Sequence, residues 1–529
     1  MRYVKVSLLI VSLLAICGVA YAQDLATEQI LRYGCESGDL GTMDPAFAKS
    51  SDDLPLIHAV FNGLLRFQPG SLNFDNIEGD LAKNWECSVD GLVWTFYLRE
   101  GVQWHGGYGE LTAEDVKFSY DRVINPDVAS RWSADYANLE RVEIVDAYTL
   151  EMHITTPDPF FPLKVVGYHG GYIVSKKAVE ELGDDFGLNP IGTGPFVFEE
   201  HKPKEKVVLV RNEEYFKGAP IIERIDYLFM SDDSTRLLSL QTGEIDTAGF
   251  PSDQAWVQAL DTAGLEVDYK YPGNQFHLHF NLTVKPLDNI LVRQALAYGI
   301  DRNAFLEYRG KTLALLEGSP VPSGYYGHTT LGVRSYDYNP ELAKTLLTEA
   351  GYPNGFSLGK VVISPKGGYQ PYMVIIQEQW RKIGVDMELT VVEHSAYHDL
   401  IRQNTNPVVL YNASRVPIAD SYLTQFYYSA SAIGKPTAVT NFSHYGEVIP
   451  GVDEFIELAR TEANPEVQKA LYAAAQRIIM ADLPAYPLFM GISIRARQPY
   501  VSFPYIADHK YENLWGAYIF DETTSILQH

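Results

Sequence analysis

Cysteine is scarce in this chain, with three in 529 residues, and this scarcity limits both metal sites and cross-links. Cys17 lies in an apolar N-terminal run, which leaves Cys35 and Cys87 for a processed protein. Two thiolates cannot supply the four ligands of an all-cysteine zinc site. An even pair in an oxidising compartment allows one disulfide. Two buried free thiols are the alternative, and the sequence does not decide between them.

Long apolar runs are also rare, and the one that is present stands at the N-terminus. Arg2 and Lys5 precede an apolar stretch over residues 6–19, and residues 20–22 (AYA) fit a small-x-small cleavage pattern. This order of features is typical of a secretory signal peptide. We therefore predict a signal peptide over residues 1–22.

Two other interpretations of this N-terminus stay open. An uncleaved membrane anchor is one of them, although the run is short for a span. A lipid attached to Cys17 is the other, although Ile16 stands where a small residue should precede a modified cysteine. After Gln23 no stretch is long and apolar enough to cross a membrane, so we expect the remaining chain to be soluble.

Positive charge is in deficit, with 42 Lys and Arg against 67 Asp and Glu, a net charge of −25. Removal of the signal peptide takes away Arg2 and Lys5 and no acidic residue, which brings the charge to −27. A strongly acidic protein repels phosphate backbones, so nucleic acid is not an expected partner. The chain has a globular composition and is long enough for two or three domains.

The local sequence pattern alternates strands with helices, which predicts an α/β fold. Asp90-Gly91 indicates a hairpin turn between the strand patterns WECSV and LVWTFYL. Farther along, Thr112 is placed to cap a helix that continues to about residue 123. Asp115, three residues after Thr112, completes a capping box.

Three further helices are predicted in the second half of the chain. One covers residues 288–302, a second begins at Asn339 and stops at Gly351, and a third covers residues 372–383. The strand pattern VDMELTVVE follows the third helix directly after Gly384. A strand, a helix and another strand in this order are typical of a parallel sheet.

Two patterns of catalytic or metal sites occur without their usual context. Ser357 is the centre of a G-x-S-x-G pattern, but it follows a helix stop and enters a strand, unlike a nucleophile elbow. His394 and His398 have the spacing of metal ligands on one helix face, but the metalloprotease glutamate is missing. The acidic neighbours Glu393 and Asp399 favour a solvated helix face. We therefore predict no catalytic residue, no metal site and no cofactor.

Five segments, in chain order, resemble the peptide/nickel group (family 5) of bacterial extracellular solute-binding proteins. They are GDLAKNWECSVDGLVWTFYLREGVQWHGG with LTAEDVKFSYDRV, NPIGTGPFVFEE, HFNLTVKPLDNILVRQALAYGIDR, SYDYNPELAKTLLTEAGYPNGF and WRKIGVDMELTVVE. The resemblance covers nearly the whole chain after the signal peptide. Five ordered segments are more specific than any single motif.

This resemblance implies a two-lobed periplasmic binding protein of the type II-like α/β fold, with three subdomains. Lobe I would comprise residues 23–272 and 485–529, with an inserted subdomain at about residues 57–189. Lobe II would comprise residues 273–484. The two crossings between lobes, at residues 271–273 and at the start of residues 485–529, are the candidate hinge. The solute would be buried in the cleft between the lobes.

The function implied by the resemblance is that of the solute-binding component of an ABC importer, with no enzyme activity. The protein would act in the periplasm as a monomer and deliver its solute to permease subunits in the inner membrane. The expected solute is an oligopeptide or a carboxylate-bearing amino-acid derivative. A small oligosaccharide and a metal chelate or haem are alternatives of the same class, and a secreted hydrolase is the alternative of another class.

The segment LYNASRVPIADSYLTQFYYS resembles the region where peptide-binding relatives place an aspartate for the peptide's amino terminus. That aspartate would fall near Arg415 or Val416, so the chain departs from the peptide pattern. Arg415 could instead clamp an anionic group of the solute, or form a structural salt bridge. Asp420 is the nearest acid, and it is either a ligand-binding residue or the cap of the following helix. Further ligand-binding candidates, from approximate family position, are Ser414, Asp39, Leu40, Tyr369, Trp132 and His277, which shares a strand face with His279.

Overall fold

The computed structural model describes most of the chain. The described residues are 25–48, 50, 52–365, 369–413, 415–435, 437–506, 508–511 and 520–529. The predicted signal peptide, residues 1–22, and the candidate site residue Ser414 lie outside them. In the described part, no helix has the length and apolar character needed to cross a membrane.

A large mixed sheet forms the spine of the molecule. Its strands follow the order β16-β12-β17-β11-β1-β10-β9-β8, with β13 paired to β17 and β19 paired to β12. Their bounds are β1 (Ile30–Cys35), β8 (Phe196–Lys202), β9 (Lys206–Arg211), β10 (Arg224–Phe229), β11 (Thr247–Phe250), β12 (Glu266–Phe280), β13 (Ala314–Leu315), β16 (Val408–Ala413), β17 (Ala485–Arg497) and β19 (Lys510–Tyr511). The central strand β1 is parallel to both β10 and β11, whereas β12 and β17 are antiparallel.

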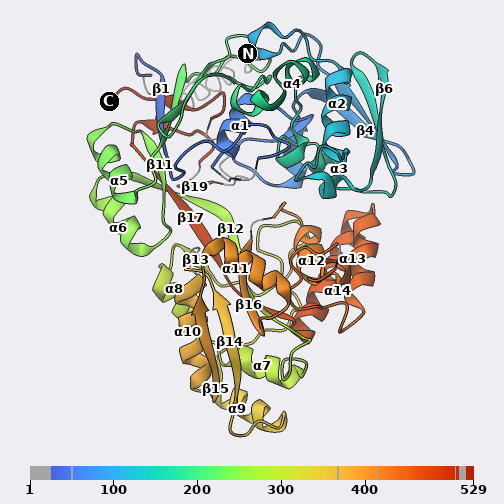
Figure 1. Ribbon diagram of the computed structural model, residues 1–529, viewed down its shortest axis with the longest axis vertical. Helices are drawn as coiled ribbons and strands as arrows, with labels where there is room; N and C mark the ends of the chain where they lie inside the picture. The colour runs from blue at the N-terminus through green and yellow to red at the C-terminus, as the bar shows by residue number, and fades with distance from the viewer. Residues whose placement is uncertain are drawn as a thin grey trace, which may run out of the picture.

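The upper lobe, as drawn in Figure 1, contains β1–β11, α1–α6 and the short C-terminal strands. A separate four-stranded sheet, β4-β5-β7-β6, lies to one side of it and is flanked by α2. The bounds are α1 (Leu54–Val60), β2 (Leu65–Phe67), β3 (Ile77–Gly79), β4 (Ala82–Cys87), β5 (Val93–Leu98), α2 (Ala113–Ile124), β6 (Leu139–Asp146), β7 (Thr149–Ile154), α3 (Phe161–Lys164), α4 (Lys176–Leu182), α5 (Asp233–Thr242), α6 (Gln254–Thr262), β18 (Val501–Ser502) and β20 (Ser525–Ile526).

The lower lobe contains β13–β16 and α7–α14 (Figure 1). The strands β14 (Phe356–Ile363) and β15 (Val385–Val391) pair in parallel and are joined by α10 (Tyr369–Arg381), which confirms the predicted order of strand, helix and strand. The other helices are α7 (Ile290–Tyr298), α8 (Asn303–Arg309), α9 (Pro340–Glu349), α11 (His394–Leu400), α12 (Ala419–Tyr427), α13 (Val452–Thr461) and α14 (Pro465–Asp482).

Two long strands, β12 and β17, carry the chain from one lobe to the other (Figure 1). They pair with each other from Glu266↔Arg497 at one end to His279↔Ala485 at the other. The pairing shifts between Lys270 and Asn274, so the ladder is interrupted at the predicted hinge segment. Extra residues in one strand bend it locally, and such an interruption suits a crossing between two lobes. The exact boundaries of the lobes and of the inserted subdomain stay predictions.

Local capping signals agree closely with the helix starts. Thr112 caps α2 with both halves of the capping box in place, and Asn339 caps α9. The Asp-Gly turn joins the antiparallel strands β4 and β5. Two predicted starts were displaced by a few residues, because Asn289 rather than Asp288 caps α7 and α10 begins at Tyr369 rather than at residue 372.

The predicted alternative of a disulfide is wrong in this structure, where Cys35 and Cys87 are both free. Cys35 ends β1 inside the large sheet, whereas Cys87 ends β4 on the separate sheet, so the two thiols belong to different layers. Cys35 is buried, and burial raises the pKa of its thiol to about 12. Cys87 is exposed, so the alternative of two buried thiols holds for Cys35 alone.

Gly273 stands where the crossing strands β12 and β17 are in close contact. A Cβ atom at this position would lie 1.9 Å from the carbonyl oxygen of Gly491 in β17. We expect Gly273→Ala to force the two strands apart and to lower the free energy of unfolding by roughly 1–3 kcal/mol. Thermal and urea unfolding measure this loss.

Gly38→Ala is the matched control, because a Cβ atom there would meet no neighbour within 4 Å. We expect its unfolding to stay within about 0.5 kcal/mol of the wild-type protein. Equal unfolding midpoints for both variants would show that the crossing tolerates a side chain at position 273.

Candidate functional site

A cavity of about 770 Å³ lies between the two lobes. One wall comes from the upper lobe, mainly from residues 131–168, and the other from residues 402–460 of the lower lobe. Ligand pockets in proteins commonly enclose about 300–1,000 Å³. The cavity therefore has room for a small solute and combines two segments that lie far apart in the sequence.

The cavity wall is rich in positive charge, although the chain as a whole carries −25. Its basic residues are Arg131, Lys164, Arg402, Arg415 and Arg460. Its acidic residues are Asp135, Asp158 and Asp420. A cleft with an excess of one charge between low-dielectric walls concentrates the opposite charge. The cavity therefore favours a solute with an acidic group.

Arg415 lies just beyond β16 and reaches the cavity from the lower lobe. Its guanidinium carbon stands 5.4 Å from the centre of the Phe426 ring, a cation–π contact that fixes the side chain. Its carbonyl oxygen accepts a hydrogen bond of 2.9 Å from the Tyr325 hydroxyl. Both contacts orient Arg415 on the lower wall of the cavity.

Asp135, on the upper wall, belongs to the same electrostatic group. The carboxyl is accessible to solvent in the cavity, but the protein around it excludes most bulk water. This desolvation raises the pKa of Asp135, while Lys164 and Arg415 act in the opposite direction. Arg415 therefore interacts with an acid of the other lobe across the cavity.

Asp420 lines the cavity, and its predicted alternative role as a helix cap is wrong. Ile418 is the N-cap of α12, and no side chain caps this helix. The Asp420 carboxylate accepts a hydrogen bond of 3.2 Å from Thr424 and pairs with Arg460 at 3.4 Å. Burial raises the pKa of Asp420, Arg460 opposes this effect, and Asp158 of the other lobe raises the pKa further.

Trp132 holds the upper wall in place. Its indole N–H donates a hydrogen bond of 2.9 Å to the carbonyl of Pro45, and the guanidinium of Arg131 lies 5.2 Å from the ring centre. Nearby, Lys164 pairs with Asp158 at 2.9 Å and donates to Asn138 at 2.8 Å. The upper wall therefore offers two cations to a solute, together with the rings of Trp132, Tyr136, Phe160 and Tyr168.

Four other sequence-predicted residues lie outside this cavity wall. Asp39 pairs with His201 at 2.9 Å, and its carboxylate accepts a hydrogen bond of 2.9 Å from the backbone N–H of Leu40. Tyr369 is buried beneath β16, where its hydroxyl accepts a hydrogen bond of 3.4 Å from the Asn412 N–H. The fourth, His277, is fully buried on β12. The structure thus brings together Arg415, Asp420 and Trp132, and separates them from these four.

His277 and its strand neighbour His279 form a buried pair on β12. Both are 0% exposed, their ring centres are 5.9 Å apart, and both contact the Phe426 ring. His277 shares a hydrogen bond of 3.4 Å with the Tyr427 hydroxyl. Within the described residues, neither ring nitrogen of His279 has a hydrogen-bond partner. Burial lowers the pKa of both histidines, that of His279 to about 3.

Ser357 lies in the surroundings predicted for it, and the histidine pair does so only in part. Ser357 is an exposed residue within β14, and this strand continues to Ile363 without the sharp turn of a nucleophile elbow. His394 and His398 both lie on α11, as predicted from their spacing, but they are half-buried rather than fully solvated.

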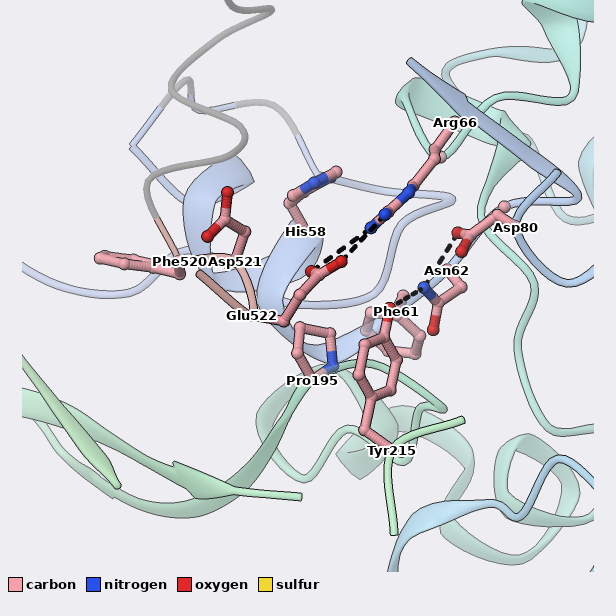
Figure 2. Close-up of a pocket in the computed structure, with 12 residues that line it drawn as sticks. His58, Phe61, Asn62, Arg66, Asp80, Pro195, Tyr215, Phe520, Asp521 and Glu522 are labelled. Atoms are coloured by element: carbon pink, nitrogen blue, oxygen red, sulfur yellow. Dashed lines mark hydrogen bonds and ion pairs between the residues drawn. The ribbon is translucent and has the colours of Figure 1, made fainter. Parts of the chain in front are cut away.

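A second, much smaller cavity of about 20 Å³ lies within the upper lobe (Figure 2). Arg66 forms hydrogen bonds with both carboxylate oxygens of Glu522, at 2.9 and 3.4 Å, and with Glu78 at 2.7 Å. Asn62 connects Asp80 with the Tyr215 hydroxyl in the same network. This volume is sufficient for about one water molecule. The network therefore ties the C-terminal segment to the upper lobe and does not hold a solute.

Residues 76–434, more than half of the chain, match the model of the bacterial extracellular solute-binding proteins, family 5 Middle. The chain belongs to this family. It is thus a solute-binding protein of the ABC importers, and the two-lobed α/β fold predicted from the resemblance is confirmed.

Known proteins with different solutes resemble this solute-binding protein. The structure of MoaA from A. tumefaciens R10, in complex with mannopinic acid, is 39% identical, covers 95% of this chain and 100% of that chain, and has a TM-score of 0.81. Heme-binding protein A of Haemophilus influenzae is 29% identical over 85% of this chain and 86% of its own length. The dipeptide-binding protein of Escherichia coli is 27% identical over 80% and 82%.

Sequence reasoning missed most of the charged residues of the cavity. Arg131, Lys164 and Asp158 lie in the inserted region, and Arg402 and Arg460 lie near α11 and on α13. They share no motif, and the two groups line one cavity only because the two lobes face each other. One of these residues could have been found from its position, because Arg131 is next to the predicted site residue Trp132 in the sequence.

The buried His279 ring gives the solute-binding protein a testable dependence on pH. Because its pKa falls to about 3 in the folded protein, below pH 6.5 the unfolded chain binds a proton that the folded chain does not. The contribution of the neutral His279 ring to the free energy of unfolding is fully present above pH 6.5. It is lost as the pH falls below this value. We expect the unfolding free energy of His279→Phe to fall less than that of the wild type between pH 6.5 and 5, by about 1–2 kcal/mol.

Val89→Phe provides the control for this measurement, because Val89 is fully exposed and is not ionisable. Its unfolding free energy should change with pH as that of the wild type does, because the substitution removes no proton-binding group. If the unfolding free energies of His279→Phe and the wild type changed equally with pH, His279 would be protonated in the folded protein, or its protonation would not be coupled to unfolding.

Proposed function

We propose that the protein captures a small amino-acid derivative with a carboxylate group in the cavity between its lobes. The observation that carries this proposal is the surplus of basic side chains in that cavity, with Arg415 on one wall and Arg131 on the other. A guanidinium in a partly desolvated cleft is suited to bidentate hydrogen bonds with a carboxylate.

The acidic residues of the cavity support an amino group on the same solute. Asp158 of the upper lobe and Asp420 of the lower lobe interact across the cavity, and Asp158 raises the pKa of Asp420. An ammonium placed between them would relieve this repulsion. A solute with a carboxylate near Arg415 and an amine near Asp420 therefore complements both parts of the wall.

Several relatives support this solute class. MoaA binds mannopinic acid, and the periplasmic protein DppA of Helicobacter pylori, 25% identical with a TM-score of 0.77, was solved with the peptide STSA. Both solutes carry acidic groups. The five basic residues that line the cavity of this chain are suited to pair with acidic groups of this kind. The position of Arg415, where peptide-binding relatives are expected to carry an aspartate, favours an acidic derivative over a plain peptide.

In this proposal the lobes close around the solute by bending at β12 and β17. The interlobe ring contact of Phe160 with Tyr326, at 5.2 Å, is present in this structure and would help to hold the lobes together around the solute. A solute shifts the open and closed states only by its extra affinity for the closed one. The closed protein, secreted to the periplasm by its N-terminal signal, would deliver the solute to the permease of an ABC importer without chemical conversion.

Native mass spectrometry of the purified protein, followed by a thermal-shift screen, tests this function. We expect carboxylate-bearing amino-acid derivatives to raise the melting temperature, because a ligand that binds only the folded state stabilises it. At a concentration 100 times the Kd the stabilisation is about 2.7 kcal/mol. Neutral oligosaccharides serve as the comparison set. Stabilisation by sugars but not by acids would contradict the proposal, and so would turnover of the bound solute.

Arg415→Ala tests the clamp with the best solute of that screen. We expect its affinity to fall at least about tenfold, which corresponds to about 1.4 kcal/mol, because the carboxylate loses a charged hydrogen-bond donor. Isothermal titration calorimetry measures the change.

Arg381→Ala, on α10 of the same lobe, is the matched control. Arg381 pairs with Glu378 and Asp386 and does not line the cavity, so its removal should leave solute affinity unchanged. A loss smaller than tenfold for Arg415→Ala would assign this arginine to the structure of the wall rather than to the solute.

A further inference from the structure

Two histidine rings meet on α11, next to the cavity wall but not part of it. The Nε2 atoms of His394 and His398 are 3.4 Å apart, and their ring centres are 4.7 Å apart in an edge-to-face arrangement. Side chains four residues apart on a helix are neighbours on one face, which explains their contact. Within the described part of the chain, neither Nε2 atom has another hydrogen-bond partner besides this contact.

Ser364 fixes the orientation of the first ring. Its hydroxyl lies 2.8 Å from Nδ1 of His394, at the residue that follows β14. When Nδ1–H donates to this hydroxyl, the lone pair of the neutral ring is on Nε2 and points toward His398. Histidines that bind metals commonly use their second nitrogen in this way, because the outer hydrogen bond sets the tautomer and direction of the ligand.

The distance between the two nitrogens matches a tetrahedral metal ion. Zinc–nitrogen bonds of about 2.0–2.1 Å at a tetrahedral angle separate two ligand nitrogens by about 3.3–3.4 Å. The same bonds at a right angle would separate them by about 2.9 Å, which a square-planar ion requires. We propose that His394 and His398 form a two-histidine site for a tetrahedral divalent metal ion of the zinc type, with Ser364 as the residue that positions His394.

The electrostatic surroundings are compatible with a bound cation. Burial lowers the pKa of His398, and His394 and Arg402 act in the same direction. Glu393 and Asp399 stand beside the two histidines in sequence and raise the pKa of His398 more weakly. Arg402 turns its guanidinium to the carbonyl oxygen of His398, at 2.7 Å.

Two coordination positions of the ion would stay open for water or another ligand. Among the described residues, the cluster with three donor side chains is a different one, formed by Glu143, Glu151 and His153 on β6 and β7. Tyr411 connects the histidine pair to the solute cavity. Its ring lines the cavity, and the ring centre lies 6.0 Å from that of His398. The proposed metal site stands without the proposed function, because it uses none of the residues assigned to the solute.

Zinc titration of the metal-free mature protein tests the site, with His153→Ala as the background that removes the competing cluster. We expect one equivalent of Zn²⁺ in isothermal titration calorimetry, and loss of at least tenfold in affinity when His394→Ala or His398→Ala is added. Ser364→Ala should weaken binding about tenfold, as substitutions of outer partners do. Co²⁺ in place of Zn²⁺ should give the visible absorption of a tetrahedral complex.

Circular dichroism and the melting temperature without metal check that each variant is folded, and His394→Gln and His398→Gln replace the alanine variants if either fails. The proposal is overturned if both histidine substitutions leave Zn²⁺ affinity unchanged. It is also overturned if the His153→Ala protein shows neither heat with Zn²⁺ nor a tetrahedral Co²⁺ spectrum. These measurements use no solute. A negative result for the metal site therefore leaves the proposed solute-binding function unaffected.

Discussion

The pairing of β12 with β17 is the constraint on which the arrangement of both lobes depends. These two antiparallel strands extend the upper sheet through β11 and continue to β16 in the lower lobe. Their ladder is interrupted between Lys270 and Asn274 and shifts again between Phe276 and His277. Main-chain hydrogen bonds therefore fix each lobe to the same pair of strands, and the interruption places the freedom to bend between them. The cavity exists because this crossing holds two walls apart.

The chemistry of the cavity follows from that two-walled construction. Asp158 is held by Lys164 on one wall and Asp420 by Arg460 on the other, and the two carboxylates oppose each other across the space. Closure without a solute brings like charges together in a region of low dielectric, which costs free energy. Under the proposed function, a solute that neutralises them, and that also offers a carboxylate to Arg415, would have extra affinity for the closed form. That difference in affinity is what closes a binding protein.

Sequence signals predicted the local structure well because they act over a few residues. The capping box of Thr112 and the cap of Asn339 need no distant partner, and both are present. The alternative roles of Asp420 and the possible disulfide were decided by tertiary structure. Asp420 finds Arg460 on another helix, and Cys35 and Cys87 are carried into different sheets. Arg415 was identified from family position, whereas Arg131 and Arg402 share no local pattern and meet only across the cavity.

The contrast between the charge of the chain and that of its cavity bears on how an acidic solute binds. At distances beyond about 10 Å, salt screens the net charge of −25, so the repulsion is felt weakly at physiological ionic strength. A solute inside the cavity would lie against the five basic side chains, at distances over which salt screens little. Under the proposed function, recognition of an acidic solute would therefore depend on the walls of the cleft rather than on long-range attraction. Selectivity would then reside in the rate of release, which depends on the walls, and less in the rate of encounter.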